Sequence, residues 1–226
     1  MSNSATQHIG KLGGRKQRQA NQAQCEADAA LVKRLLAGDQ SAFTALVDTH
    51  HTKLLRLART FVQDGATAEE VVQDTWMGVL KGLHSFEGRS TLKTWIFRIL
   101  TNRAQTRAKR EGRSIAFSAL VGPDEEPAVD PARFAKNGRW ADPPKAWVSH
   151  TPEKQALLGE ARAVIEEAIK ELPPNQRAVV TLRDIEGLSP EDVCSTLEIS
   201  ESNHRVLLHR GRSKLRTALE RRLNAS

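Results

Sequence analysis

Cysteine is scarce in this sequence of 226 residues, and no long hydrophobic run is present. The two cysteines, Cys25 and Cys194, lie far apart, which argues against a disulfide framework and against a CxxC zinc site. The seven histidines show no spacing typical of metal ligands. No apolar segment reaches the length of a membrane span, and the N-terminus lacks the apolar core of a secretion signal. We therefore expect a cytoplasmic protein with no membrane insertion, no metal site and no cofactor.

The patterns of an enzyme site are missing as well. The sequence offers no metal cluster, no phosphate-binding glycine loop and no pairing of a nucleophile with a base. We therefore predict no catalytic residue, and an enzyme that processes nucleic acid is the weakest interpretation of this chain.

Positive charge is what the sequence has in excess. The net charge is +7, and the basic residues are clustered. Residues 89–113 include eight Lys or Arg against one acid, and residues 201–222 include seven against two. A need for solubility explains the total charge but not the clustering. Two separate contacts with a polyanion are therefore predicted, with binding that weakens as the salt concentration rises.

Apolar residues recur at helical spacing over about 85 residues from Ala27, and strand signals are absent, so an all-α fold is predicted. The first helix is short and ends near Gly38. The second begins at Asp39 or Ser41 and ends at Asp64 and the glycine that follows it.

A third helix is predicted to open with a capping box formed by Thr67 and Glu70, and a fourth to be capped by Ser90. Apolar positions of the third helix are expected to face a core: Val71, Val72, Thr75, Trp76, Val79, Leu80 and Leu83. Those of the fourth helix are Leu92, Trp95, Ile96, Ile99 and Leu100. The four helices are expected to form one compact bundle.

A proline-rich segment separates this bundle from the rest of the chain. Six of the nine prolines lie within residues 114–152, where no helical period is sustained. The predicted organisation is a disordered basic tail (1–25), a four-helix domain (26–113), a flexible linker (114–151) and a second helical domain (152–226).

Three aromatic residues of the linker, Phe134, Trp140 and Trp147, are unusual in a solvated spacer and indicate docking on this chain or on a partner. In the second domain, one helix is predicted over 152–172 and another over 175–186, with two prolines between them.

Residues 188–222 have the pattern of a helix-turn-helix. Ser189 can cap a first helix that begins with Pro190, and Ser200 can cap a second. On the second helix, basic residues recur at intervals of four, three and four: Arg205, His209, Arg212 and Arg216. A basic helix alone is usually a solvated surface. A capped first helix, a polar turn and an apolar stripe behind the cations instead favour DNA binding.

Four polar side chains share one exposed stripe at the start of the third predicted helix: Glu69, Glu70, Gln73 and Asp74. No histidine or cysteine accompanies them at ligand spacing, which argues against a metal or acid-base site. Compensation of the helix dipole explains the two glutamates but not Asp74. A protein-protein contact surface explains all four.

The fourth predicted helix also has the pattern of DNA binding. Its arginines can follow a phosphate backbone: Arg98, Arg103, Arg107 and Arg110. Asn102 can both donate to and accept from a base edge. In the loop before the helix, Phe86 is either a stacking surface for an unpaired base or a core anchor that closes the helical hairpin. The sequence leaves that choice open.

Three motifs, in this order, resemble regions 2 and 4 of bacterial sigma factors: AEEVVQDTW (68–76), SFEGRSTLKTWIFRILTN (85–102) and LPPNQRAVVTLRDIEGLSPEDV (172–193). The chain looks most like the extracytoplasmic-function (ECF) group of the sigma-70 family, which keeps only these two domains. The resemblance covers roughly residues 27–112 and 153–222. It implies a non-enzymatic protein that binds core RNA polymerase, directs it to promoters through their −10 and −35 elements, and assists DNA melting.

The resemblance also implies roles for matching positions. The residues implied to bind the clamp helices of core polymerase are Glu69, Glu70, Gln73 and Asp74. Binding of the −10 element falls to Phe86, Arg89, Lys93, Arg98, Asn102, Arg103 and Arg107. Binding of the −35 element falls to Ser200, Asn203, Arg205, His209, Arg210 and Arg212. The implied partners are core RNA polymerase (clamp helices and flap), promoter DNA and an anti-sigma factor that masks both domains.

The chain departs from the family at one place in the second helix of the helix-turn-helix. Many members have a small polar residue and an arginine directly after the position of Arg205, where this chain has Val206 and Leu207. A DNA-facing cation is therefore expected to be missing, and the −35 sequence read by other members does not transfer. The alternative interpretation is a helix-turn-helix regulator that binds duplex DNA without polymerase. It leaves the stripe at 69–74 unexplained.

Overall fold

The structure is a computed structural model that describes residues 24–113, 115, 117 and 165–223. Every regular element in this part of the chain is helical and none is a strand, as the apolar spacing predicts. Residues 1–23 of the predicted tail and most of the predicted linker, with its three aromatic residues, lie outside the described residues, whereas residues 24 and 25 of that tail are helical. No helix in the described part is long and apolar enough to cross a membrane.

Residues 24–113, called here the first half, contain most of the predicted bundle. A helix over 24–36 begins earlier than predicted and ends before Gly38, whose φ of 81° reverses the chain. It is followed by α2 (Gln40–Phe61), α3 (Gly65–Gly82), the short 3-10 helix η1 (Leu83–Ser85) and α4 (Leu92–Arg110).

The helix starts follow the strongest local acceptors. Asp39 caps α2, one of the two predicted residues, and its carboxylate accepts from the backbone N–H of Ala42 at 3.0 Å. The predicted capping box at Thr67 is wrong. The Asp64 carboxylate caps α3 by accepting from the backbone of Ala66 and Thr67, so the helix starts earlier. An ionised carboxylate is the stronger acceptor, and it outcompetes the hydroxyl three residues later.

The predicted cap of α4 is wrong by one residue. The Thr91 hydroxyl, rather than that of Ser90, accepts from the backbone N–H of Thr94 at 3.1 Å. The reason lies 64 residues away in the sequence. The buried carboxylate of Asp28 accepts from the backbone N–H of Leu92 at 2.6 Å and fixes Leu92 as the first helical residue.

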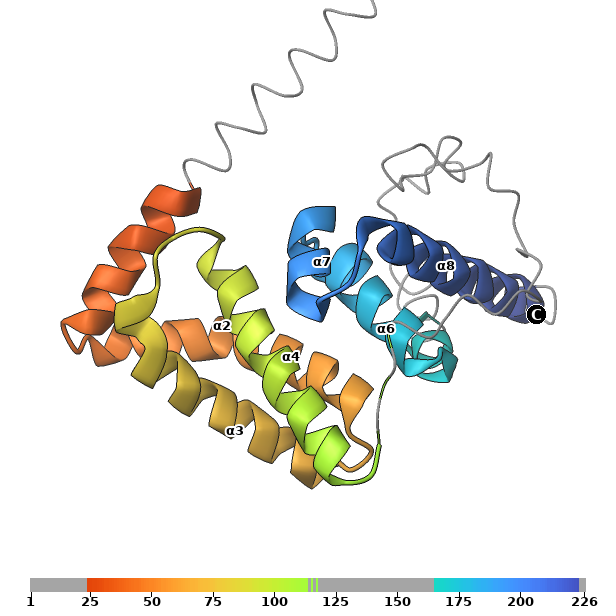
Figure 1. Ribbon diagram of the computed structural model, residues 1–226, viewed down its shortest axis with the longest axis horizontal. Coiled ribbons are helices and arrows are strands. Elements are labelled where there is room, and N and C mark those ends of the chain that lie inside the picture. Colours follow the sequence, from red (N-terminus) through yellow and green to blue (C-terminus); the bar gives the residue numbers. More distant parts are fainter. Residues whose placement is uncertain (1–23, 114, 116, 118–164, 224–226) are drawn as a thin grey trace, which may run out of the picture.

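Helices α2, α3 and α4 pack on one another and enclose the core of the first half (Figure 1). Its fully buried large side chains are Leu54, Leu57, Phe61, Val72, Leu92, Ile96, Phe97 and Leu100. The predicted inward position of Leu80 is wrong, because Leu80 lies seven residues after Gln73, on the face that α3 turns to solvent. Trp95 and Ile99 pack only at the edge of the core.

Residues 165–223, called here the second half, begin with a helix over 165–171. It is followed by α6 (Pro174–Val180), the π-helix η3 (Thr181–Ile185), α7 (Pro190–Leu197) and α8 (Glu201–Leu223). The predicted helix over 175–186 is thus two elements, because the chain widens to an i→i+5 hydrogen bond from Glu186 to Thr181.

The helix-turn-helix is confirmed. The Ser189 hydroxyl accepts from the backbone of Asp192 at 3.0 Å and caps α7, and that of Ser200 accepts from Asn203 at 3.3 Å. Helix α8 crosses α6 at Gly211, where a Cβ atom would lie 2.6 Å from Val180. Only glycine permits this close approach.

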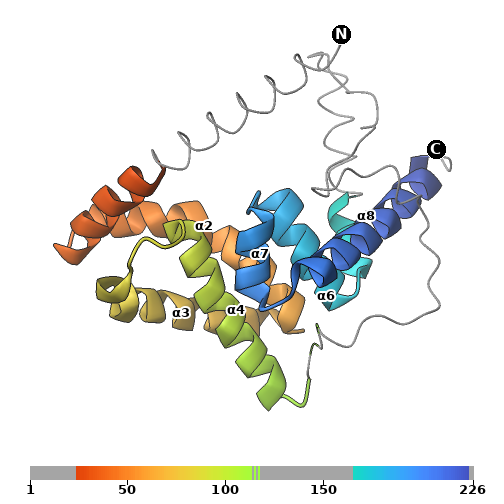
Figure 2. The same cartoon turned by 45° about the horizontal axis from the view of Figure 1, so that its top comes forward.

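The two halves are in contact. Helix α7 packs against α4 and α6 packs against α2, as Figures 1 and 2 show from two directions. The helix-turn-helix therefore lies against the face of the first half that carries the start of α4.

Candidate functional site

An open pocket of about 390 Å³ lies between α3 and α4. It brings together residues predicted for two different partners: Glu70 and Asp74 from α3, and Asn102, Arg103 and Arg107 from α4. The rest of the lining consists of Val71, Ile99, Thr106 and Arg110. One pair of packed helices therefore presents carboxylates and cations side by side.

Arg107 joins the two walls of the pocket. Its guanidinium lies 3.2 Å from the Glu70 carboxylate and donates to Glu111, one turn along α4, at 2.6 Å. The hydrogen bond to Glu111, and after it the charge of Glu70, raise the pKa of Arg107. The side chains are largely exposed, so these pairs contribute little stability and an incoming partner can replace them.

Arg103 lies across α3 where Gly78 leaves room. A Cβ atom at position 78 would lie 2.5 Å from a terminal nitrogen of Arg103. The missing side chain lets this guanidinium rest on α3. Nearer the start of α4 than Arg103, Arg98 and Asn102 are exposed to solvent.

The exposed face of α3 is larger than the sequence predicts. The four predicted residues, Glu69 to Asp74, are all exposed, and Met77 (53% exposed) and Leu80 (49%) continue the same face. Sequence reasoning missed these two because apolar residues are expected to point inward. The available signal is their helical spacing, since Met77 lies four residues and Leu80 seven residues after Gln73. We call this set of six residues the α3 stripe; exposed apolar side chains bordered by polar ones are typical of a protein contact surface.

The loop between η1 and α4 holds the remaining predicted residues of this region. Phe86 is half-buried and meets Trp95 edge-on, with ring centres 5.4 Å apart, which is the contact that a core anchor requires. Arg89 is exposed and pairs with Glu87 at 2.9 Å. Gly88 has a φ of 69°, which permits the turn between them.

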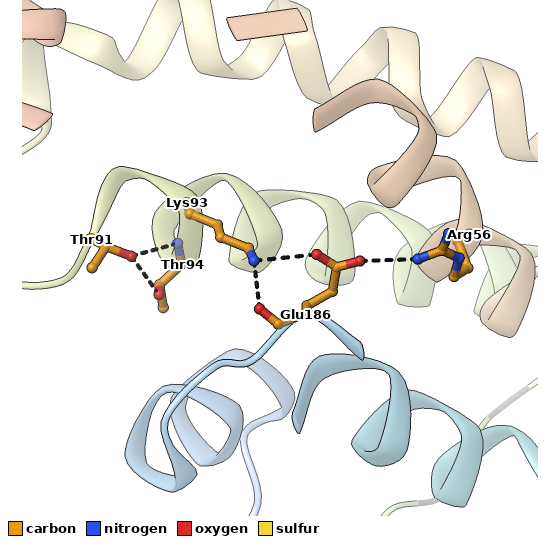
Figure 3. Close-up of polar contacts among 5 residues, drawn as sticks. All are labelled: Arg56, Thr91, Lys93, Thr94 and Glu186. Carbon is orange, nitrogen blue, oxygen red and sulfur yellow. Dashed lines mark hydrogen bonds and ion pairs between the residues drawn. The ribbon is translucent and has the colours of Figure 1, made fainter. Parts of the chain in front are cut away.

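Lys93 lies at the contact between the halves rather than on open surface. Its ammonium donates to the backbone oxygen of Glu186 at 2.6 Å and lies 3.2 Å from the Glu186 carboxylate. The other carboxylate oxygen lies 3.3 Å from a guanidinium nitrogen of Arg56 on α2 (Figure 3). Sequence reasoning missed both Glu186 and Arg56, because no local pattern links positions 130 residues apart.

The predicted −35 residues on α8 are not equally available. Arg205 is exposed and pairs with Glu201, one turn earlier, at 3.0 Å. Arg212 is mostly buried and forms a two-pronged ion pair with Asp184, at 2.9 and 2.5 Å. The Asn203 amide donates to the backbone oxygen of Phe117 at 2.6 Å.

Ser200 is exposed and caps α8, while His209 and Arg210 are half-buried on it. The sequence predicts that a DNA-facing cation is missing at positions 206 and 207, and the structure shows that these two positions differ in exposure. Leu207 is 0% exposed and belongs to the core, whereas Val206 is 36% exposed. In this chain a side chain at position 207 therefore cannot reach DNA, and 206 is the position that could carry an additional cation.

Within the described residues, no three His, Cys, Asp or Glu side chains are placed to hold a metal ion. What the described residues offer is therefore binding: an acidic and apolar face on α3, cations and an amide on α4, and a basic helix in a helix-turn-helix.

Comparison with known proteins identifies this arrangement. A family model for sigma-70 region 2 matches residues 46–114, and one for sigma-70 region 4 matches residues 162–215. The RNA polymerase sigma-H factor of Pseudomonas aeruginosa is 30% identical over 195 residues, which cover 86% of this chain and 95% of that protein. The chain belongs to the sigma-70 family. It is a sigma factor of the ECF type, it directs promoter recognition by RNA polymerase, and it is not itself an enzyme.

Other relatives agree with this assignment. The ECF RNA polymerase sigma-E factor of Escherichia coli is 29% identical over 188 residues, covering 83% of this sigma factor and 92% of that one. Two solved structures share the fold. CnrH, in complex with the cytosolic domain of CnrY, has a TM-score of 0.52 at 23% identity and covers 86% of this chain and 97% of its own. RpoE from Bartonella quintana, in complex with the anti-sigma factor NepR, has a TM-score of 0.51 at 24% identity, with coverages of 79% and 96%.

The match to region 2 excludes the alternative of a simple helix-turn-helix regulator, which would need only the region 4 match. It also gives the α3 stripe a place within a domain of the sigma-70 family.

Proposed function

We propose that this sigma factor binds core RNA polymerase through the α3 stripe, binds the melted −10 strand through α4 and the loop before it, and reads the −35 element with α8. The pocket between α3 and α4 is the observation that supports this division most directly. One pair of packed helices presents the carboxylates of α3 beside the arginines and the amide of α4, and the apolar part of the α3 stripe continues along α3. A single domain can therefore hold polymerase and DNA at the same time.

In this proposal, the DNA duplex melts because the protein binds unpaired bases more tightly than paired ones. Arg98 and Asn102 are exposed on α4, where a cation can neutralise a phosphate and an amide can pair with the edge of an unstacked base. A site that binds an extruded base and excludes a paired one shifts the equilibrium toward open DNA without any covalent step. The contact between Phe86 and Trp95 supports a positioning role for Phe86 within this loop.

Recognition of the −35 element is assigned to the start of α8. In helix-turn-helix proteins, the N-terminal residues of the second helix contact base edges. Here those residues are Ser200, Asn203 and Arg205, while His209, Arg210 and Arg212 lie further along the same helix. Arg205 is the most exposed cation of the group and the best candidate for a base contact.

We further propose that residues 26–113 and 152–226 act as two domains joined by a linker at 114–151, and that the protein works in the cytoplasm. The second domain would contact the polymerase flap. An anti-sigma factor that covers both domains is the expected inhibitor, since the related RpoE was solved with the anti-sigma factor NepR.

The test is a binding measurement with purified core RNA polymerase, followed by run-off transcription on fragmented genomic DNA. The double reversal Glu70→Lys, Asp74→Lys should weaken polymerase binding at least about tenfold, because it places like charges against a basic partner. Asp48→Lys, an equal change per residue on the exposed face of α2, is the control and should bind normally. Unchanged affinity of the double variant, with a normal helical content, would remove the α3 stripe from the polymerase contact.

A further inference from the structure

A buried carboxylate bridges the two halves of this sigma factor. The Glu186 side chain is only 3% exposed, and it lies between Arg56 of α2 and Lys93 of α4 (Figure 3). Burying an unpaired carboxylate costs several kcal/mol, so such a group is retained only with partners. Both partners here belong to the first half, and Glu186 belongs to the second. Glu186 is therefore paired with these two cations only while the halves are in contact.

Two neighbouring contacts occupy further residues that the proposed function assigns to DNA. Asp184, two residues before Glu186, holds Arg212 through both carboxylate oxygens. The Asn203 amide donates to the backbone oxygen of Phe117, which follows the first half in the sequence and packs against Phe61 of α2. Three predicted DNA contacts, Lys93, Asn203 and Arg212, are thus engaged within the chain. The internal partner of both Lys93 and Arg212 is a carboxylate, an anion as a DNA phosphate is.

The spacing of the two promoter elements shows that this arrangement cannot be the one that binds a promoter. The −35 and −10 elements lie about 25 base pairs apart, or about 85 Å along B-form DNA at 3.4 Å per base pair. Because Asp184 and Glu186 are two residues apart, Lys93 and Arg212 lie within about 20 Å of each other. One closed molecule cannot place both cations on their respective elements.

We infer that Glu186 is an intramolecular latch: its carboxylate takes the place of a DNA phosphate at Lys93 and keeps the two halves closed until polymerase or promoter DNA separates them. This inference rests on the proposed assignment of Lys93 to the −10 element. Arg56 completes the latch but is not a proposed DNA contact, so the latch can be loosened without changing the DNA-binding surface.

The first arm of the test measures closure without DNA. Spin labels are placed at the exposed positions Lys81 on α3 and Ser195 on α7 of the full chain, after Cys25→Ser and Cys194→Ala remove the native thiols. The parent protein should give one narrow distance distribution. Glu186→Gln, which keeps the size of the side chain and removes its charge, should broaden and lengthen it. Glu191→Gln removes an exposed acid of α7 and should change nothing. A distribution as narrow in Glu186→Gln as in the parent would overturn the latch.

The second arm measures binding of a single-stranded oligonucleotide, namely the −10 region of a promoter mapped by run-off transcription. If the closed form outnumbers the open form by about ten to one, Glu186→Gln should bind about tenfold more tightly, because closure reduces the fraction of competent molecules. Arg56→Gln should act in the same direction and is the safeguard should Glu186→Gln fold poorly. Opening without any gain in affinity would show that closure does not compete with DNA and would overturn the proposal.

The variant Lys93→Gln tests the proposed DNA contact of Lys93 independently of the latch. In the Glu186→Gln background, where the latch is already absent, this change should weaken oligonucleotide binding. If it does not, Lys93 is no DNA contact and the idea that Glu186 replaces a phosphate is overturned. The label distances still report separately whether Glu186 closes the molecule.

Discussion

The two halves of this sigma factor use their helices differently. On α3, the core face and the contact face are separate: Val72 and Val79 point inward, while the α3 stripe points to solvent. On α8, one helix supplies core residues, internal ion pairs and the proposed DNA contacts within a few turns. A helix with separate faces can be interpreted from its own sequence, whereas α8 can be interpreted only with its neighbours.

The largest expected effect comes from placing a cation where α8 faces the core. Leu207→Arg should destabilise the second half by about 3 kcal/mol or more, because it buries an unpaired charge and overpacks a closed site. Val206→Arg, on the exposed side of the same turn, should change stability by no more than about 0.5 kcal/mol. Urea unfolding of the two variants is the measurement. Equal tolerance of both would mean that the two faces of α8 are not distinct.

Variants of Arg205 and Arg212 can distinguish a DNA contact on α8 from an ion pair within the protein. Arg205→Ala should reduce −35-dependent transcription by roughly 1–3 kcal/mol of binding free energy, with stability almost unchanged, since its exposed pair with Glu201 contributes little. Arg212→Ala should instead lower the melting temperature, because it leaves Asp184 without its two-pronged partner. Transcription assays and thermal melts on both variants would contradict this division if the two effects were exchanged.

Acidification should weaken the first half through His50. Burial lowers the pKa of His50 from 6.5 to about 4, so the folded form keeps this side chain neutral. Below pH 6.5 the unfolded chain binds a proton that the folded chain does not, and stability falls until about pH 4. After allowance for partial exposure, the loss is roughly 1–2 kcal/mol.

The measurement is urea unfolding between pH 7 and pH 4, with His50→Asn as the comparison. The variant should show a shallower fall in the free energy of unfolding. Burial also lowers the pKa of His204 in the second half, so part of the slope should persist until that residue is replaced too. Identical slopes in the parent and the His50 variant would contradict the assignment.

The smallest effect concerns the start of α4. Thr91→Ala should cost about 1 kcal/mol because it removes the N-cap of the helix, and Ser90→Ala should cost almost nothing. Thermal melts of the two variants are directly comparable, since the residues are adjacent and both changes delete one hydroxyl. A larger effect at Ser90 would restore the cap that the sequence predicts.

Sequence alone predicts what depends on neighbours three or four residues away. The helices, the caps at Asp39 and Ser189, and the four polar residues of the α3 stripe all follow from such spacing. Where two local candidates were comparable, as at Ser90 and Thr91, the choice was made by Asp28, which is distant in the sequence.

The features that the sequence does not predict correctly share a physical cause. The sequence prediction places Leu80 in the core because it weighs the apolar character of the side chain and not the face of the helix on which Leu80 lies. Glu186 looked like an ordinary acid before a glycine, and its partners on α2 and α4 became visible only in three dimensions. The sequence predicts that Leu207 replaces a DNA-facing cation, but the Leu207 side chain is buried. The face of α8 that is buried is set by the packing of α6 and α7, which the sequence of α8 alone does not reveal.

The wide turn η3 sets the direction of two carboxylates at once. Asp184 is directed toward α8 and Glu186 toward the first half, and from Glu186 to Thr181 the chain closes an i→i+5 hydrogen bond in place of the i→i+4 bond of an α-helix. Removing a residue from η3 would rotate everything after it by about 100° and carry both acids away from their partners. An insertion or deletion in η3 should therefore be tolerated less well than a substitution. In relatives that share this latch, we expect the residue types in η3 to vary more than the number of residues.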